Sequence, residues 1–349
     1  MKRIFYLIPL FLSFLCWSEE ASCSKLYKFL SELSPVTSRA LSKTLSKYYD
    51  PVKFPSMVEI VEVAPRDGLQ NEPISLSIEE RLALIKLLEE SGLNSIEGGA
   101  FVNPKRVPQM DKSFEVAQHL SAKESEVSYP FLVPNLKGLE QAMKAGVKEV
   151  AIFTSPSTEF TQKNIGMSVQ ESLKVQREVV RQAVANNIWV RGYVSCVMGC
   201  PYTPGPMDPN EVRVVSEELL DFGCYQISLG DTIGVGSPEL TESLLDTVVV
   251  KPGYDPDLFA AHFHDTNQLA LLNLVVALGH GISTIDSSVG GLGACPYALG
   301  ATGNVATESV VRLLSALDIE TGVDEEKLAL AREYAFRALH KNVVEAADL

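Results

Sequence analysis

The chain has 349 residues, of which 46% are hydrophobic and 21% charged, so it can bury a large core in one or two domains. Its formal net charge of -14 excludes nucleic acid as an expected partner, because phosphate binding requires a basic face. Its six cysteines are irregularly spaced, which in a chain this long favours a reducing compartment over a disulfide framework.

The first 55 residues differ from the rest, with eight Lys/Arg and four Asp/Glu, a net charge of +4. Lys2 and Arg3 precede an apolar run, Ile4–Leu15, which resembles the start of a signal peptide. The Ser/Lys-rich stretch Ser22–Lys47 instead favours a mitochondrial presequence, and Met57 allows an over-extended start. We therefore expect a leader over 1–55 and one domain over 56–349. The expected location is the cytoplasm, or the mitochondrial matrix in a eukaryote; the signal-like segment leaves export or membrane anchoring open.

From residue 57 onward, short β-type runs alternate with helical patterns. The expected strands are Met57–Ala64, Leu93–Glu97, Val127–Val133, Glu149–Ser155, Trp189–Cys196, Tyr225–Gly230, Leu258–His264 and Thr284–Val289. The clearest helices are Ile78–Glu90, Ser168–Asn186, Pro209–Asp221, Gln268–His280, Asn304–Ala316 and, after the eighth strand, Asp324–Asn342. Eight such units in about 260 residues predict an α/β fold, a (β/α)8 TIM barrel with an additional C-terminal helix.

In a barrel of this kind the chemistry lies at the C-terminal ends of the strands. The first expected strand ends in Arg66-Asp67, which could bring a cation and a metal-binding carboxylate to one site or form a simple ion pair. The second ends in Glu97, and Asp231 ends the sixth, where it could act as a base or cap the next helix.

The seventh expected strand ends in His262-Phe263-His264. Residues two apart point to the same face of a strand, so both imidazoles can reach one ion. A mixed set of carboxylate and imidazole ligands favours Mg²⁺, Mn²⁺ or a similar ion over a structural zinc. No feature of the sequence requires an organic cofactor.

Three further features point to the same mouth of the barrel. Three glycines precede Cys295 in a loop after the eighth strand, and a thiol on such a loop can enter the site and carry a proton. Asn304 follows as either a helix N-cap or a metal ligand through its amide oxygen. Arg191 and Tyr193 share one face of the fifth strand, and an inward orientation would bring them to the substrate.

Seven ordered motifs run from about Val58 to Gly322. They read VEVAPRDGLQNE, FVNPKRVPQM, NLKGLEQAMKAGVKEVAIF, RGYVSCVMGCPY, SLGDTIGVG, HFHDT and GLGACPYALGATGNVATE. Together they resemble the hydroxymethylglutaryl-CoA lyases, within the wider superfamily of metal-dependent barrel lyases and acyl-CoA carboligases. The resemblance implies cleavage of 3-hydroxy-3-methylglutaryl-CoA to acetyl-CoA and acetoacetate, with an acyl-CoA partner and a homodimeric assembly.

The resemblance also implies a role for each matching residue. The implied metal ligands are Asp67, His262, His264 and Asn304. The implied catalytic groups are Arg66, Cys295, Asp231, Glu97 and His262, and the implied substrate contacts are Arg66, Arg191 and Tyr193. Arg66 would stabilise the enolate, Asp231 would lie near the substrate hydroxyl, and Cys295 would be the acid/base thiol.

Three alternatives remain open at this stage. A carboligase of the same superfamily, such as a homocitrate, isopropylmalate or citramalate synthase, would run the condensation; the Cys295 loop favours the lyases. A lyase acting on a related 3-hydroxyacyl-CoA is the second alternative, because Gly98-Gly99 after Glu97 and Asn267–Leu269 after Thr266 depart from the family pattern. An exported, non-catalytic binding protein would explain the leader, and the intact set of polar residues argues against it.

Overall fold

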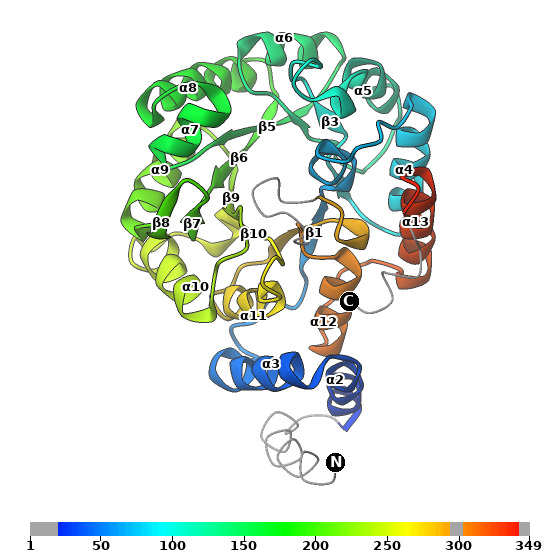
Figure 1. Cartoon of the computed structure of the whole chain (residues 1–349), viewed down its shortest axis with the longest axis vertical. Coiled ribbons are helices and arrows are strands. Elements are labelled where there is room, and N and C mark those ends of the chain that lie inside the picture. Colours follow the sequence, from blue (N-terminus) through cyan, green and yellow to red (C-terminus); the bar gives the residue numbers. More distant parts are fainter. Residues whose placement is uncertain (1–19, 294–302, 342–349) are drawn as a thin grey trace.

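Eight parallel strand positions surround a central axis in the computed structural model, which describes residues 20–293 and 303–341 (Figure 1). The strands of this main sheet are β1 (Glu59–Glu62), β2 (Ser95–Ile96), β3 (Gly99–Ala100), β4 (Phe131–Leu132), β5 (Glu149–Thr154), β6 (Trp189–Ser195), β9 (Gln226–Asp231), β10 (Phe259–Phe263) and β11 (Thr284–Ser287). Their order is β2-β1-β11-β10-β9-β6-β5-β4-β3. Parallel neighbours need a crossover connection, which the helices between the strands provide, and every pairing in this sheet is parallel.

The ring closes through β2 and β3, which are two halves of the single strand predicted near Leu93–Glu97. The amide of Glu97 donates to Glu62 on one side, and the amide of Gly98 donates to Pro130 on the other. The break falls at Gly98 and Gly99, and glycine is required at Gly98 because a Cβ there would lie 2.5 Å from the Phe131 ring. Gly99 also has a φ of 153°, which side chains rarely adopt. The predicted eight-stranded barrel is thus confirmed, with one strand split in two.

Helices form the outer layer of the barrel (Figure 1). They are α4 (Ile78–Glu90), α5 (Ser113–Ser121), α6 (Leu136–Lys144), α7 (Thr158–Ile165), α8 (Val169–Ala185), α9 (Pro209–Phe222), α10 (Pro238–Leu245), α11 (Ala270–Gly279), α12 (Thr307–Ala316) and α13 (Glu325–Ala338). Capping boxes start two of them, Ser77 with Glu80 at α4 and Ser168 with Glu171 at α8. The additional C-terminal helix is α13.

Three local elements differ from the sequence prediction. The β1 strand ends early and turns into a π-helix, η1 (Ala64–Gly68). A short antiparallel pair, β7 (Gly199–Cys200) with β8 (Thr203–Pro206), follows β6. The predicted helix at Asn304 begins only at Thr307, so Asn304 is not its N-cap and that alternative is wrong.

Two helices precede the barrel, α2 (Glu20–Glu32) and α3 (Pro35–Tyr48), and they pack beside α11 and α12 (Figure 1). Leu26, Leu41 and Leu45 are buried there. Nine of the ten residues of α11 are buried, whereas the exposed outer face of a barrel helix is normally polar. The apolar outer face of α11 is therefore covered by α3.

No helix among the described residues is long and apolar enough to cross a membrane. The apolar run Ile4–Leu15, on which the signal-like interpretation rests, lies outside the described residues.

Candidate active site

A cavity of about 600 Å³ opens at the C-terminal ends of the strands. Arg66, Asp67, Tyr193, His262 and His264 line it, as the sequence predicted for the chemical end of the barrel. Glu97, Arg191, Asp231 and Asn304 are not among its lining residues; each lies directly behind or beside that lining.

The η1 turn brings Arg66 and Asp67 to this mouth. The Arg66 guanidinium donates from Nε to Glu97 Oε2 over 2.7 Å and from Nη1 to Asp67 Oδ1 over 2.6 Å. Burial disfavours the charged guanidinium, but Glu97 and Asp67 outweigh that effect and raise the pKa of Arg66. The side chain is therefore a fixed cation, held at the wall of the cavity by two carboxylates.

Asp67, His262 and His264 form a cluster that can hold a metal ion. One ligand atom from each lies within 4.8 Å of the others, and it is the one group of this kind among the described residues. Burial opposes the charged form of Asp67, but Arg66 and the two imidazoles lower its pKa to about 2. Asp67 is therefore an anion at neutral pH, as a metal ligand must be.

His264 and Asn304 have properties that suit metal ligands. The Nδ1 atom of His264 is shielded from solvent and has no hydrogen-bond partner among the described residues. Burial lowers the pKa of His264 to about 4, so the ring is neutral at pH 7 and can donate a lone pair. The Asn304 amide lies 2.9 Å from Asp67 Oδ2, at the edge of the cluster. The donor set of two imidazoles, one carboxylate and one amide fits a divalent cation.

The orientation of His262 depends on Asp286, a residue that the sequence analysis missed. His262 Nδ1 lies 3.1 Å from Asp286 Oδ2, and this leaves Nε2 directed toward Asp67, 3.9 Å away. A carboxylate behind a ligating histidine is a common support of metal sites. The clue in the sequence was Asp286, the one charged residue of the eighth strand.

Arg191 anchors that carboxylate in turn. Its guanidinium forms two hydrogen bonds with Asp286, of 2.7 and 3.0 Å, and a third with the Tyr193 hydroxyl. Burial opposes ionisation of Asp286, but Arg191 and His262 hold its pKa well below its usual range. Arg191 and Tyr193 do point into the barrel. Arg191 lies beneath the cavity, whereas Tyr193 forms part of its wall.

Glu62, a second residue missed from the sequence, holds the η1 turn in place. Its carboxylate is fully buried and accepts the amides of Ala64 and Val289 and the hydroxyl of Thr307. Burial raises its pKa to about 7 despite these hydrogen bonds. Glu62 therefore ties the turn that carries Arg66 and Asp67 to the end of the eighth strand.

Asp231 is buried at the end of β9, and its neighbours Gly230 and Thr232 line the cavity. Its two oxygens accept the backbone amides of Val235 and Gly236. Burial raises its pKa to about 6 in spite of these amides. In this arrangement the carboxylate organises the loop that precedes α10.

Cys295 lies outside the described residues. Gly293, which comes shortly before Cys295, lies beside Asn304 at the edge of the Asp67–His262–His264 cluster: a Cβ there would lie 2.5 Å from the Asn304 amide nitrogen. After Cys295 in the chain, the carbonyl oxygen of Gly303 accepts a hydrogen bond from the amide of Asp265, the residue that directly follows His264. Both flanks of the Cys295 segment are therefore anchored at the cluster.

Comparison with known proteins gives concordant matches. The family model described as HMGL-like matches residues 57–334. The mitochondrial hydroxymethylglutaryl-CoA lyase of Macaca fascicularis is 48% identical over 288 residues, 82% of this chain and 87% of that protein. The 3-hydroxy-3-isohexenylglutaryl-CoA/hydroxy-methylglutaryl-CoA lyase of Pseudomonas aeruginosa is 46% identical over 291 residues, 83% of this chain and 96% of that protein. A crystal structure of hydroxymethylglutaryl-CoA lyase from Pseudomonas aeruginosa is similar with a TM-score of 0.80 and 46% identity, covering 84% of this chain and 97% of that one.

Proposed function

The chain belongs to the HMGL-like family, and on that premise we propose that it is a carbon–carbon lyase that cleaves 3-hydroxy-3-methylglutaryl-CoA into acetyl-CoA and acetoacetate. The observation that carries the proposal is the meeting of a fixed cation, Arg66, and a cation-binding cluster, Asp67 with His262 and His264, in one cavity. Similarity to lyases gives the reaction, and the cavity supplies the groups that the reaction needs.

The ion that we propose is Mg²⁺ or Mn²⁺, held by Asp67, His262, His264 and Asn304. When bound, such an ion polarises substrate oxygens and lowers the pKa of a hydroxyl group. Asp286 keeps His262 in the tautomer and orientation that a ligand requires. Arg191 keeps Asp286 ionised, so we propose that Arg191 acts on the site as a positioning residue beneath the substrate, while Tyr193 contacts the substrate directly.

The bond between C2 and C3 of the acyl group breaks when the tertiary hydroxyl loses its proton. The electron pair of the C2–C3 bond passes to C2 and is delocalised into the thioester, so negative charge develops on the thioester oxygen. We propose that Arg66 stabilises this enolate, since a preorganised cation in a shielded cavity needs no reorganisation. Glu97 and Asp67 hold the guanidinium in place through its Nε and Nη1 atoms.

Asp231 is the proposed base for the hydroxyl proton. Its pKa of about 6 is in the range that suits proton transfer near neutrality. Each of its oxygens accepts one backbone amide and keeps a second lone pair, which can take up the proton. Turnover by an Asp231→Asn variant near that of the wild type would remove Asp231 from this role.

Cys295 is the proposed acid that returns a proton to C2 of the acetyl-CoA enolate. Gly293 and Gly303, which flank Cys295 in the chain, both lie beside residues of the cluster, and this supports the assignment. A thiol is suited to the task because it can donate a proton and recover it from water in each cycle.

The test is a direct comparison of substrates with the purified chain. Cleavage of 3-hydroxy-3-methylglutaryl-CoA should far exceed condensation of acetyl-CoA with any 2-oxo acid, which a carboligase would prefer. A 3-hydroxyacyl-CoA with a longer branch, of the kind named for the Pseudomonas relative, should be included. Faster turnover of that compound would support the lyase reaction and show that 3-hydroxy-3-methylglutaryl-CoA is not the preferred substrate.

The proposal also covers the oligomeric state and the cellular location. We propose a homodimer in solution, which light scattering on the full chain would test. CoA thioesters occur inside cells, so we propose the cytoplasm, or the mitochondrial matrix in a eukaryote, as the location. Fractionation with an N-terminal sequence of the isolated protein would test both the location and the fate of the predicted leader.

A further inference from the structure

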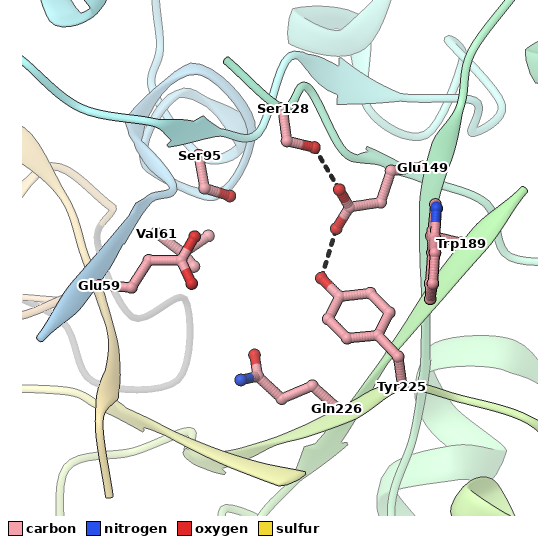
Figure 2. Close-up of a pocket in the computed structure, with 8 residues that line it drawn as sticks. All are labelled: Glu59, Val61, Ser95, Ser128, Glu149, Trp189, Tyr225 and Gln226. Carbon is pink, nitrogen blue, oxygen red and sulfur yellow. Dashed lines mark hydrogen bonds between the residues drawn. The ribbon is translucent and has the colours of Figure 1, made fainter. Parts of the chain in front are cut away.

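A second cavity, of about 350 Å³, lies at the opposite mouth of the barrel, where the strands begin (Figure 2). Its lining includes the first residues of β1, β2, β5 and β6, which are Glu59, Ser95, Glu149 and Trp189. Tyr225, directly before β9, completes the wall beside Trp189. None of the residues used in the proposed reaction lines this cavity.

The charge of this second cavity is negative. Two glutamates line it, and no lysine or arginine does. Arg191 attracts the Glu59 carboxylate from a distance, but its guanidinium is engaged by both oxygens of Asp286, and Asp286 and Glu149 repel Glu59. The Glu59 carboxylate makes no hydrogen bond or ion pair within residues 20–293 and 303–341. Glu59 is an exposed carboxylate that forms no ion pair within these residues, and a second carboxylate lines the same cavity, so this mouth of the barrel favours the binding of a cation.

Ser95 gives an independent indication of a ligand. Its side chain is 5% exposed, and its hydroxyl has no hydrogen-bond partner in the described part of the chain. Figure 2 shows this hydroxyl and the Glu59 carboxylate directed into the hollow from one side. Because Ser95 lines the cavity, its hydroxyl is free to form a hydrogen bond with a ligand bound there.

The opposite wall is aromatic and rigid. Glu149 accepts the hydroxyls of Ser128 and Tyr225, which fixes both the carboxylate and the phenol (Figure 2). The rings of Trp189 and Tyr225 meet edge to face, with centroids 6.0 Å apart. Trp189 is 67% exposed at the rim, so its ring is accessible to a ligand that enters the cavity. Aromatic rings attract cations in addition to the carboxylates.

The geometry points to a binding site for a small protonated aliphatic amine at this N-terminal mouth, with Glu59, Ser95 and Glu149 accepting its N–H groups and Trp189 and Tyr225 flanking it. A metal ion fits less well, because metal binding requires a tight group of ligands. Among the described residues the one tight group of three is Asp67, His262 and His264 at the other mouth. The cavity is also larger than a bare ion requires, and an amine with an alkyl chain can use the aromatic wall.

The experiment is calorimetric titration of the full chain with putrescine, a four-carbon diamine. We expect one saturable site per chain and no binding of 1,4-butanediol, which has the same length and no charge. Glu59→Gln should weaken putrescine binding about tenfold or more, and Ser95→Ala several-fold. Glu140→Gln is the matched control and should leave the affinity unchanged, because Glu140 is an exposed residue of α6 that pairs with no other described residue.

Trp189 provides a second readout. Its fluorescence should change with saturating putrescine, and the change should disappear in Trp189→Phe while circular dichroism shows a folded protein. Absence of saturable putrescine binding to the wild type would overturn the proposal. Equal affinity for butanediol, unchanged affinity in Glu59→Gln, or displacement of putrescine by micromolar Mg²⁺ would also overturn it. Because the readout is binding and not turnover, the result does not depend on the proposed lyase activity.

Discussion

Replacing Asp286 with asparagine tests the support beneath the metal cluster. The change removes the negative charge that faces both Arg191 and His262 and leaves the shape of the side chain almost intact. Loss of one partner of a buried ion pair leaves the other charge uncompensated, which costs about 3–5 kcal/mol of unfolding free energy. Loss of the carboxylate behind a ligating histidine lowers metal affinity by about 10–100-fold. Asp286→Asn should therefore reduce stability and Mn²⁺ affinity together.

Urea unfolding and Mn²⁺ titration at pH 7.5 measure these two effects. Asp246→Asn is the matched control, because its half-exposed carboxylate also pairs with a histidine, His280, and should contribute less than about 1 kcal/mol. Ser228→Ala removes one hydrogen bond to Asp286 and keeps the ion pair, so it should cost about 1 kcal/mol and affect Mn²⁺ less. Wild-type stability and Mn²⁺ affinity in Asp286→Asn would refute the reasoning.

Four other changes extend the account. Cys295→Ala should keep Mn²⁺ and substrate binding and lose most turnover in a steady-state assay; near-wild-type turnover would remove the thiol from the mechanism. Burial raises the pKa of Glu62 from 4.5 to about 7, so the folded state binds this proton more tightly and stability falls by about 3 kcal/mol as the pH rises through that window. In Glu62→Gln the free energy of unfolding, measured with urea, should no longer show this decline between pH 4.5 and 7. A pH dependence equal to that of the wild type would contradict the prediction. Arg106 is exposed and lines the cavity, so Arg106→Ala should raise KM for the acyl-CoA about tenfold with a smaller change in kcat; an unaltered KM would exclude this contact. Leu41 is buried on α3, the helix that covers α11, so Leu41→Ala should lower the free energy of unfolding by about 2–5 kcal/mol in urea. Val36→Ala, at an α3 position that is 80% exposed, should lower it by almost nothing, and equal losses would show that α3 does not pack there.

Much of the barrel could be predicted from the chain because its signals are local. Runs such as Trp189–Cys196 and Leu258–His264 are short, apolar and separated by amphipathic helices, and their observed bounds differ by a residue or so. The split of the second strand could not be predicted in the same way. It depends on the contact between Gly98 and the ring of Phe131, which lies more than thirty residues away.

The cavity lining shows the same division. Arg66, Asp67, His262 and His264 stand at strand ends, where the barrel brings them together whatever their distance in sequence. Asp286 escaped notice because its importance comes from its partners, Arg191 and His262, which lie on two other strands.

The N-terminal region illustrates a different difficulty. Its basic composition and the run Ile4–Leu15 predicted a leader over 1–55, yet α2 and α3 within that range contribute buried leucines. The pattern of α11 could have indicated this, because the helix has an apolar outer face that requires a cover. Composition describes a segment by itself, whereas packing depends on the surface that the segment meets.

The central claim is that the cluster at the C-terminal mouth supports metal-dependent cleavage of 3-hydroxy-3-methylglutaryl-CoA. The most direct measurement incubates the purified chain with that thioester and quantifies acetoacetate and acetyl-CoA, before and after chelation and on return of Mg²⁺ or Mn²⁺. We predict equal amounts of the two products, loss of both on chelation, and their recovery with the metal. An intact thioester in the presence of metal, or cleavage that chelation does not affect, would contradict the account.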